Sequence, residues 1–227
     1  MPSEVTLIDL DRQGSVFILS MRSGENRFNR RFVDALHGAL DDVERSSGPA
    51  ALVSVGEDKF YSNGLDLDWL TGEGSAQGPE FIAAFMAVLG RILALPIPTV
   101  AAMNGHAFAG GAMLALVHDF RVMRADRGFF CLPEVDIGLP FAAGMSAIIQ
   151  AKLDASTARD LMLTGRRIGG TEAAALRVVD ETAAADQVLA SAVARAETLS
   201  SKERTTYGAI KRGMYADVIR LLRGAAA

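Results

Sequence analysis

Two segments of the 227-residue chain follow the same plan, in which a short apolar strand leads through a glycine-bearing loop into a helix. The segments are 50–70 and 98–117, and they share this layout although their residues match poorly. Their strands, at 50–55 and 98–103, are apolar almost throughout, which is typical of strands that are buried on both faces of a sheet. This plan predicts an α/β fold.

The remaining elements are expected around these two segments. A hairpin is expected from strands at 5–10 and 16–21 with a turn at 11–14. The next helix should span 30–45, since its apolar residues recur at helical spacing (Phe32, Leu36, Leu40 and Val43). Asp66 is a plausible N-cap for a short helix, and Pro79 fits the start of a helix that reaches about Leu95. Further strands are expected at 119–123 and 129–132, and further helices at 112–117, 141–153, 156–163, 171–176, 184–199 and 203–223.

Composition narrows the class of protein. The formal net charge of −4 does not suggest a nucleic-acid surface. Cys131 is the only cysteine, so neither an internal disulfide nor a cysteine-based zinc site can form. The apolar stretch 81–103 is interrupted by Arg91, Pro96 and Pro98, and the ends of the chain resemble neither a signal peptide nor a peroxisomal address. We therefore expect a soluble, cytoplasmic protein that binds neither nucleic acid nor a membrane.

The glycine loops are candidates for binding a negatively charged oxygen. The N-terminus of a helix presents unpaired N–H groups and favours negative charge, and glycine allows a ligand to approach the backbone closely. Gly64–Leu65 and Gly110–Gly111 can each offer one N–H group, and two such donors on one carbonyl oxygen form an oxyanion hole. The alternative is that these glycines serve only tight turns and packing. The spacing from Gly105 to Gly110 does not match the dinucleotide-binding motif.

Glu134 is the candidate acid or base. It lies between the apolar residues 129–132 and the loop 135–140, and a desolvated carboxylate has a raised pKa that suits proton transfer near neutral pH. Asp136 is an alternative acid, and a surface role for Glu134 remains open. His106 and His118 are interpreted as structural, because their spacing implies no metal site and no nucleophile elbow is present.

Three motifs, in order along the chain, resemble the crotonase family, also called the enoyl-CoA hydratase/isomerase family. Residues 60–67 (Phe-Tyr-Ser-Asn-Gly-Leu-Asp-Leu) resemble its first oxyanion-hole segment, and 98–107 with 109–111 resemble the second. Residues 132–139 (Leu-Pro-Glu-Val-Asp-Ile-Gly-Leu) resemble its catalytic-glutamate segment. Later landmarks are similar at 163–167, 172–173 and 178–180, so the resemblance covers almost the whole chain.

The resemblance implies a fold, a ligand and an assembly. The fold is a spiral of β-β-α turns over 1–181 with a helical C-terminal region at 182–227, assembled as a trimer or a dimer of trimers. The substrate is an acyl-CoA of fatty-acid metabolism whose thioester oxygen accepts the N–H groups of Leu65 and Gly110; no separate cofactor is expected, because CoA is part of the substrate. CoA phosphates would bind near the loop 25–29, which makes Arg27 a candidate. The alternative interpretation of the basic cluster Arg27, Arg30 and Arg31 is a solvated helix face. The other residues expected beside the substrate are Gly64, Asp66, Gly111 and Met113.

Departures from the family pattern favour one reaction within it. Hydratases of this family carry a second glutamate three residues after the oxyanion glycine, and Met113 stands there in this chain. A single glutamate at the position of Glu134 is the pattern of Δ3,Δ2-enoyl-CoA isomerases, which residues 118–128 also resemble. We therefore predict conversion of 3-enoyl-CoA to trans-2-enoyl-CoA, with Glu134 moving the proton. The alternatives are hydration or another crotonase-type reaction, and a non-catalytic acyl-CoA-binding homologue. A smaller departure from the family pattern is Arg177, which stands at a local turn where the family usually has glycine.

Overall fold

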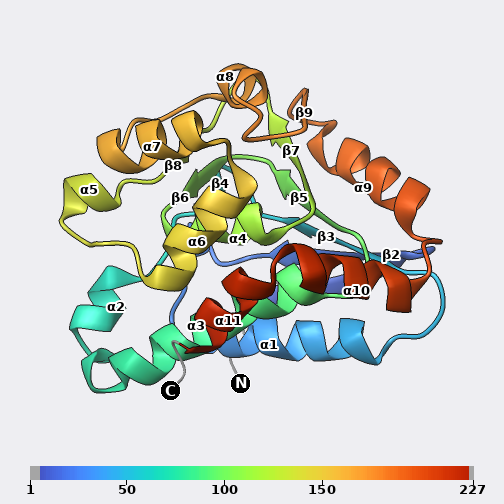
Figure 1. Cartoon of the computed structure of the whole chain (residues 1–227), viewed down its shortest axis with the longest axis horizontal. Helices are drawn as coiled ribbons and strands as arrows, with labels where there is room; N and C mark the ends of the chain where they lie inside the picture. The colour runs from blue at the N-terminus through green and yellow to red at the C-terminus, as the bar shows by residue number, and fades with distance from the viewer. Residues whose placement is uncertain (1–5, 225–227) are drawn as a thin grey trace.

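A six-stranded sheet forms the centre of the computed structural model, which describes residues 6–224 (Figure 1). The strand order is β1-β2-β3-β5-β7-β9. A hairpin pairs β1 (Ile8–Gln13) with β2 (Val16–Met21) in antiparallel fashion, and all later neighbours are parallel. These parallel strands are β3 (Ala51–Val55), β5 (Thr99–Met103), β7 (Phe120–Arg124) and β9 (Glu181–Ala183).

A second, smaller sheet lies beside the first and explains the repeated plan of the sequence. It contains β4 (Phe60–Ser62), β6 (His106–Phe108) and β8 (Phe130–Cys131), which are parallel to one another in that order. Each of these short strands follows a strand of the large sheet and leads toward a helix. The chain therefore makes three successive β-β-α turns, which confirms the predicted crotonase-like spiral.

Helices cover both faces of the large sheet. Side chains alternate along β3, where Leu52 faces the larger core cluster while Ala51 and Val53 face the smaller one. The smaller cluster is closed by α9 (Val188–Leu199), which crosses β3, β5 and β7 (Figure 1). The larger cluster includes the buried faces of α1 (Arg30–Arg45), α3 (Gly78–Ala94) and α4 (Gly110–Val117). All eight residues of α4 are buried, so the loop that begins it is rigidly supported.

The apolar helix α3 is part of this core. Within residues 6–224, the segment Ser75–Ala94 is long and apolar enough to cross a membrane by length and composition alone. In the fold, Phe81, Phe85 and Leu89 of this segment are fully buried, and α3 packs against α1, α4 and α11 (Ala216–Gly224). It is a core helix, which agrees with the interrupted apolar pattern.

The C-terminal region is helical, but the single helix expected at 203–223 is wrong. Instead, α10 (Arg204–Met214) and α11 are separated at Tyr215. The two helices bury different partners. Lys211 of α10 reaches Asp119 at 2.9 Å, whereas Leu222 of α11 is buried against α3 and α6 (Ala143–Lys152). The break allows each helix to reach its own partner.

Three smaller helices complete the fold near the site. They are α5 (Glu134–Ile137), α7 (Ala155–Thr164) and α8 (Gly170–Ala175). The turn that follows α8 contains Arg177 at a φ of 55°, a left-handed conformation that favours glycine. The family's usual glycine at this position is therefore explained by the backbone, and the turn forms here with arginine in its place.

Candidate active site

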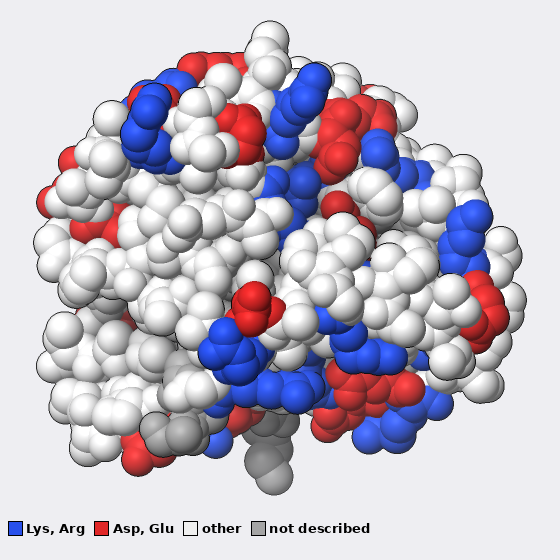
Figure 2. All heavy atoms as spheres, in the orientation of Figure 1, with Lys and Arg blue, Asp and Glu red and all other residues white. Residues whose placement is uncertain are grey.

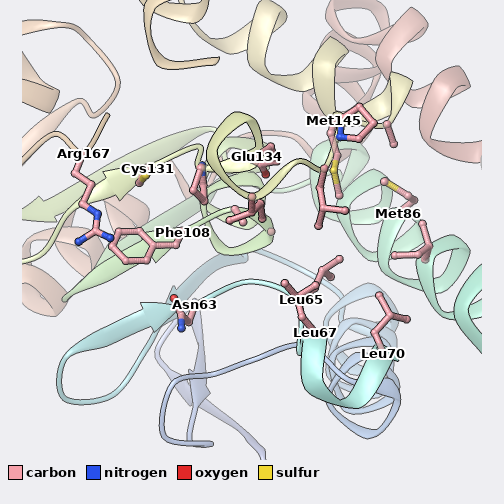
Figure 3. Close-up of a pocket in the computed structure, with 18 residues that line it drawn as sticks. Asn63, Leu65, Leu67, Leu70, Met86, Phe108, Cys131, Glu134, Met145 and Arg167 are labelled. Atoms are coloured by element: carbon pink, nitrogen blue, oxygen red, sulfur yellow. The ribbon is translucent and has the colours of Figure 1, made fainter. Parts of the chain in front are cut away.

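One mainly apolar cavity lies between α3, α5, α6 and the short helix α2 (Leu67–Thr71) (Figure 3). Its volume is about 380 Å³. Glu134, Leu65 and Gly110, the three residues predicted to carry the chemistry, all line it. The structure thus brings together residues that are 69 positions apart in the sequence, counting from Leu65 to Glu134.

The two ends of this cavity differ in chemistry. At one end lie polar and aromatic side chains (Asn63, Phe108 and Arg167), and the guanidinium of Arg167 stacks 5.3 Å from the centroid of the Phe108 ring (Figure 3). At the other end lie apolar side chains (Leu70, Met86 and Met145). Glu134 lies between the two ends in Figure 3. An elongated ligand with one polar and one apolar end matches this arrangement.

Glu134 is buried without a partner for one of its oxygens. The residue is 7% exposed, and its Oε2 atom accepts no hydrogen bond from any described residue. Burial raises the pKa of this carboxyl from 4.5 to about 7, because removal of water disfavours the charged form. An unpartnered buried carboxylate costs stability, so its presence in a cavity points to function.

Two loops meet beside this carboxylate. Gly64, at a φ of 83°, follows β4, and Gly110 begins α4 after β6. A methyl group on Gly64 would lie 2.9 Å from the carbonyl oxygen of Phe108 and 3.0 Å from the nitrogen of Gly110. The two backbones therefore touch, and only glycine permits both the conformation and the contact at position 64.

Both loops are held by backbone contacts. The N–H of Phe28 donates to the carbonyl of Gly64 at 2.8 Å, and the N–H of Asp66 donates to the carbonyl of Phe28 at 2.9 Å. These bonds use the groups on either side of Leu65 and leave its own N–H free. On the second loop, Gly111 packs so closely on the backbone of Ser62 that no side chain would fit there.

Two unused backbone N–H groups indicate a shared binding site. In the described part of the chain, no hydrogen bond uses the N–H of Leu65 or that of Gly110. The Gly110 N–H belongs to the first turn of α4, where N–H groups have no acceptor within the helix. Two unused donors and one unpartnered carboxylate therefore line the same apolar cavity, an arrangement that can bind a carbonyl oxygen and move a proton beside it.

Other residues predicted beside the substrate lie outside the cavity lining. Asp66 caps α2, where its carboxylate accepts the N–H of Trp69 at 3.2 Å. Met113 is fully buried in α4 and packs in the large core. Gly64 and Gly111 belong to the two loops, where each lies against the backbone of the other loop. Asp136 is exposed, and its carboxylate packs over Gly165 and away from the cavity.

Arg27 is connected to the polar end of the cavity through other side chains. Its guanidinium contacts Glu25 at 2.6 Å and Asp68 at 3.2 Å. Glu25 in turn accepts a hydrogen bond at 2.9 Å from the side-chain amide of Asn63, which lines the cavity. Arg27 thus lies near the polar end of the cavity but outside its lining.

The two candidate histidines are placed in the core and in an aromatic cluster, as their structural interpretation implies. His118 is fully buried, with its ring nitrogens 2.9 Å from the Ser54 hydroxyl and 2.8 Å from the carbonyl of Leu114. Burial lowers the pKa of His118 to about 3, so the ring is neutral near pH 7. His106 stacks among phenylalanine rings, including Phe108. No group of three His, Cys, Asp or Glu side chains within 6–224 is placed to hold a metal ion.

Sequence reasoning missed several residues that line the cavity. Arg167 lies in the Leu-Thr-Gly-Arg-Arg segment that carries part of the family resemblance, but its type and position alone do not distinguish it from the neighbouring Arg166. Arg166 forms ion pairs with Asp160 and Glu172, both at 2.6 Å, whereas Arg167 has no carboxylate partner among the described residues. Only the three-dimensional contacts separate the two arginines.

Comparison with known proteins agrees with this geometry. A family model described as enoyl-CoA hydratase/isomerase matches residues 11–225. Enoyl-CoA delta isomerase 3 of Arabidopsis thaliana is 36% identical over 223 residues, with 94% of each chain covered. A putative enoyl-CoA hydratase of Thermus thermophilus is 36% identical over 201 residues, which cover 86% of this chain and 78% of the relative.

Solved structures show the same fold. A structure described as an enoyl-CoA isomerase of Mycobacterium tuberculosis superposes with a TM-score of 0.89 at 27% identity, covering 98% of this chain and 97% of the other. Another, described as a probable enoyl-CoA hydratase of the same species, gives a TM-score of 0.90 at 26% identity and covers 97% and 93% of the two chains. Together with the family match, these likenesses show that the chain belongs to the enoyl-CoA hydratase/isomerase family, the crotonases.

Proposed function

We propose that this chain converts 3-enoyl-CoA thioesters to trans-2-enoyl-CoA thioesters. The observation that carries the proposal is the pairing of one unpartnered buried carboxylate, on Glu134, with two unused N–H donors in one apolar cavity. The names of the Arabidopsis relatives, which are enoyl-CoA delta isomerases, support the same reaction.

The mechanism follows from the roles of these groups. The thioester oxygen accepts hydrogen bonds from the N–H groups of Leu65 and Gly110. The Glu134 carboxylate removes a proton from C2, and the electron pair of that C–H bond moves toward the thioester oxygen, where the two donors stabilise the dienolate. Protonated Glu134 then gives its proton to C4. The double bond moves from C3–C4 to C2–C3, and the enzyme returns to its starting state without a cofactor.

A single carboxylate favours isomerisation over hydration. Addition of water requires a group that holds and deprotonates the water while another proton reaches C2. Glu134 is the one carboxylate among the described residues that line the cavity, since Asp136 packs over Gly165. Transfer of one proton between C2 and C4 needs only one carboxylate that reaches both carbons.

Turnover of 3-hexenoyl-CoA by the purified protein tests the proposal. A non-catalytic homologue would bind acyl-CoA but leave the position of the double bond unchanged, so the appearance of trans-2-hexenoyl-CoA separates the two functions. A decarboxylase or another crotonase-type enzyme would likewise give no such product.

The rate of isomerisation should depend on pH through Glu134. The base must be ionised, and burial raises its pKa to about 7. We therefore expect kcat/KM to fall about tenfold per pH unit below this value and to level off above it. Initial rates measured with 3-hexenoyl-CoA between pH 5 and pH 9 test this fall of kcat/KM at low pH. A kcat/KM that stays constant down to about pH 5 would contradict it.

The same titration should appear in protein stability, which gives an independent control. Between pH 4.5 and about pH 7 the folded protein keeps a proton on Glu134 that the unfolded chain has lost, because folding raises the pKa of this carboxyl from 4.5 to about 7. The contribution of this residue to the free energy of unfolding is therefore full below 4.5 and is lost as the pH rises through 7. Because the carboxyl also faces the cavity, we expect a loss on the order of 2 kcal/mol. Glu134→Gln should lack this pH dependence in denaturant titrations.

Arg27 is proposed to contact a phosphate of CoA near the polar end of the cavity. Arg27→Ala should then weaken CoA binding by about tenfold or less, the range for loss of one charge-assisted hydrogen bond at an exposed site. Calorimetry with free CoA measures the change. Arg30→Ala is the matched control and should leave the affinity unchanged, because Arg30 pairs with Asp34 of its own helix and not with Glu25, which contacts the cavity-lining Asn63. Equal affinities of the Arg27→Ala variant and the parent protein would exclude the contact.

We also propose that the chain assembles as a trimer or a dimer of trimers. Exposed apolar side chains support self-association: Val135, Ile137 and Leu139 on or beside α5 are 50%, 47% and 45% exposed, and Leu163 of α7 is 69% exposed. In Figure 2 mostly uncharged atoms cover the middle of the left half of the molecule, whereas acidic and basic atoms lie along its upper left edge, where Figure 1 places α5 and α7. Burial of this surface in an oligomer would remove it from water.

A further inference from the structure

A second cavity adjoins the apolar end of the candidate active site. It has a volume of about 310 Å³ and lies between α3 and α11, where Gly90, Pro96 and Leu222 are among its lining residues. Met86 lines both this cavity and the first one. The two cavities are therefore separated at Met86.

Helix geometry explains why this one side chain separates them. Ile82, Met86 and Gly90 are spaced four residues apart on α3, so they follow one another along one face of the helix. Ile82 lines the first cavity and Gly90 lines the second. Met86, between them, is fully buried, and Figure 3 shows its side chain at the apolar end of the active-site cavity.

We propose that Met86 forms the end wall of the acyl-binding site and so sets the longest acyl chain that the enzyme binds fully. The proposal rests on the isomerase function proposed above, because it assigns the apolar end of the cavity to the acyl chain. Past Met86 the second cavity continues along the same face of α3. Removal of the methionine side chain would join the two spaces and admit longer chains.

Affinities for saturated acyl-CoAs test this wall without requiring turnover. Calorimetry with hexanoyl- to hexadecanoyl-CoA should show affinity rising about fourfold per added methylene in the parent protein until the chain reaches Met86, and then levelling off. In Met86→Ala the rise should continue through several further methylenes. Met86→Val, which removes less volume from the core and endangers folding less, should extend the rise by fewer methylenes.

Gly90 offers a matched control. A first carbon added at Gly90 would lie 3.7 Å from Leu222, an ordinary contact, and Gly90 lines the second cavity, so a leucine here is chosen to occupy that space. Gly90→Leu alone should not change the acyl-chain length at which the affinity levels off, because the acyl chain stops at Met86. In the double variant with Met86→Ala, the same change should abolish the extension.

Three results would overturn the proposal. Levelling at the parent chain length in both Met86→Ala and Met86→Val would show that another residue ends the site. If the affinity of Gly90→Leu alone levelled off at a shorter acyl chain than that of the parent protein, the chain would already pass Met86. If no acyl-CoA bound at any length, acyl-CoA would not be the ligand of this cavity. Failure of the reaction is distinguishable, since a protein that binds acyl-CoAs with this length dependence but does not isomerise 3-hexenoyl-CoA contradicts only the proposed function.

Discussion

Replacing Glu134 with glutamine is expected to lower the rate of 3-enoyl-CoA isomerisation by about 10²–10⁴-fold, the range for loss of a positioned general base. Glutamine keeps the shape of the side chain but cannot accept a proton from C2 and return it to C4. Because one oxygen of the carboxylate has no hydrogen-bond partner among the described residues, the change should leave the fold and the affinity for acyl-CoA intact. Steady-state rates with 3-hexenoyl-CoA, and calorimetry with hexanoyl-CoA, measure the two quantities separately.

Asp136→Asn provides the control for this variant. Asp136 follows Glu134 by two residues and carries the same charge, but it is exposed and packs over Gly165. Its loss should change the rate by less than about twofold. If Glu134→Gln keeps most of its turnover, or if Asp136→Asn loses as much as Glu134→Gln, then the proton is moved by a different group.

Gly64→Ala should reduce kcat/KM by about 10²–10³-fold, a loss comparable to that of one oxyanion-hole donor. The added methyl group would lie 2.9 Å from the carbonyl oxygen of Phe108 and 3.0 Å from the nitrogen of Gly110. These are backbone atoms, so the two loops must move apart and the N–H groups of Leu65 and Gly110 can no longer point at one oxygen. Kinetics with 3-hexenoyl-CoA, together with denaturant unfolding, separates lost activity from lost stability.

Gly14→Ala is the matched control for backbone strain. Gly14 also has a positive φ, of 59°, but no atom would lie within 4 Å of its added methyl group. It should cost about 1–2 kcal/mol of stability, as a left-handed alanine does, while activity stays unchanged. Full activity in Gly64→Ala would mean that the two N–H groups do not act on the substrate together.

The parts of the fold that were predictable from sequence are those that local pattern determines. The stripe of apolar residues in α1 predicted its bounds, Arg30–Arg45, because one face of the helix is buried and the other is exposed to solvent. The side chain of Asp66 caps α2, as its residue type suggests. By contrast, β4, β6 and β9 have three residues each, too few for any periodicity, and they exist because neighbouring strands supply their hydrogen bonds.

Local pattern misled at the hairpin and at the C-terminus. The first strand runs from Ile8 to Gln13, so residues expected in the turn belong to the strand, and Val5 lies outside the described residues. Pairing with β2 extends the strand through Asp11 and Arg12, whose polar side chains are exposed. No proline marks the break between α10 and α11 at Tyr215, so the sequence pattern predicted one continuous helix there.

The site was predictable where a motif specifies the backbone, and less so where side-chain contacts decide. The family motifs identified the two glycine loops and Glu134, and these converge on one cavity. Met113 marks the absence of a second glutamate in the sequence, yet the structure buries it in the core outside the cavity lining. Arg167 and Met86 line the cavity through contacts made across the fold, which the order of residues does not reveal.

Side-by-side kinetics with 3-hexenoyl-CoA and crotonyl-CoA test the central claim most directly. A cavity lined by one carboxylate should isomerise the first substrate clearly and hydrate the second at least about 100-fold less efficiently, as judged by kcat/KM in the same preparation. Comparable values of kcat/KM for the two reactions, or hydration without isomerisation, would contradict the assignment of this chain as a single-glutamate enoyl-CoA isomerase.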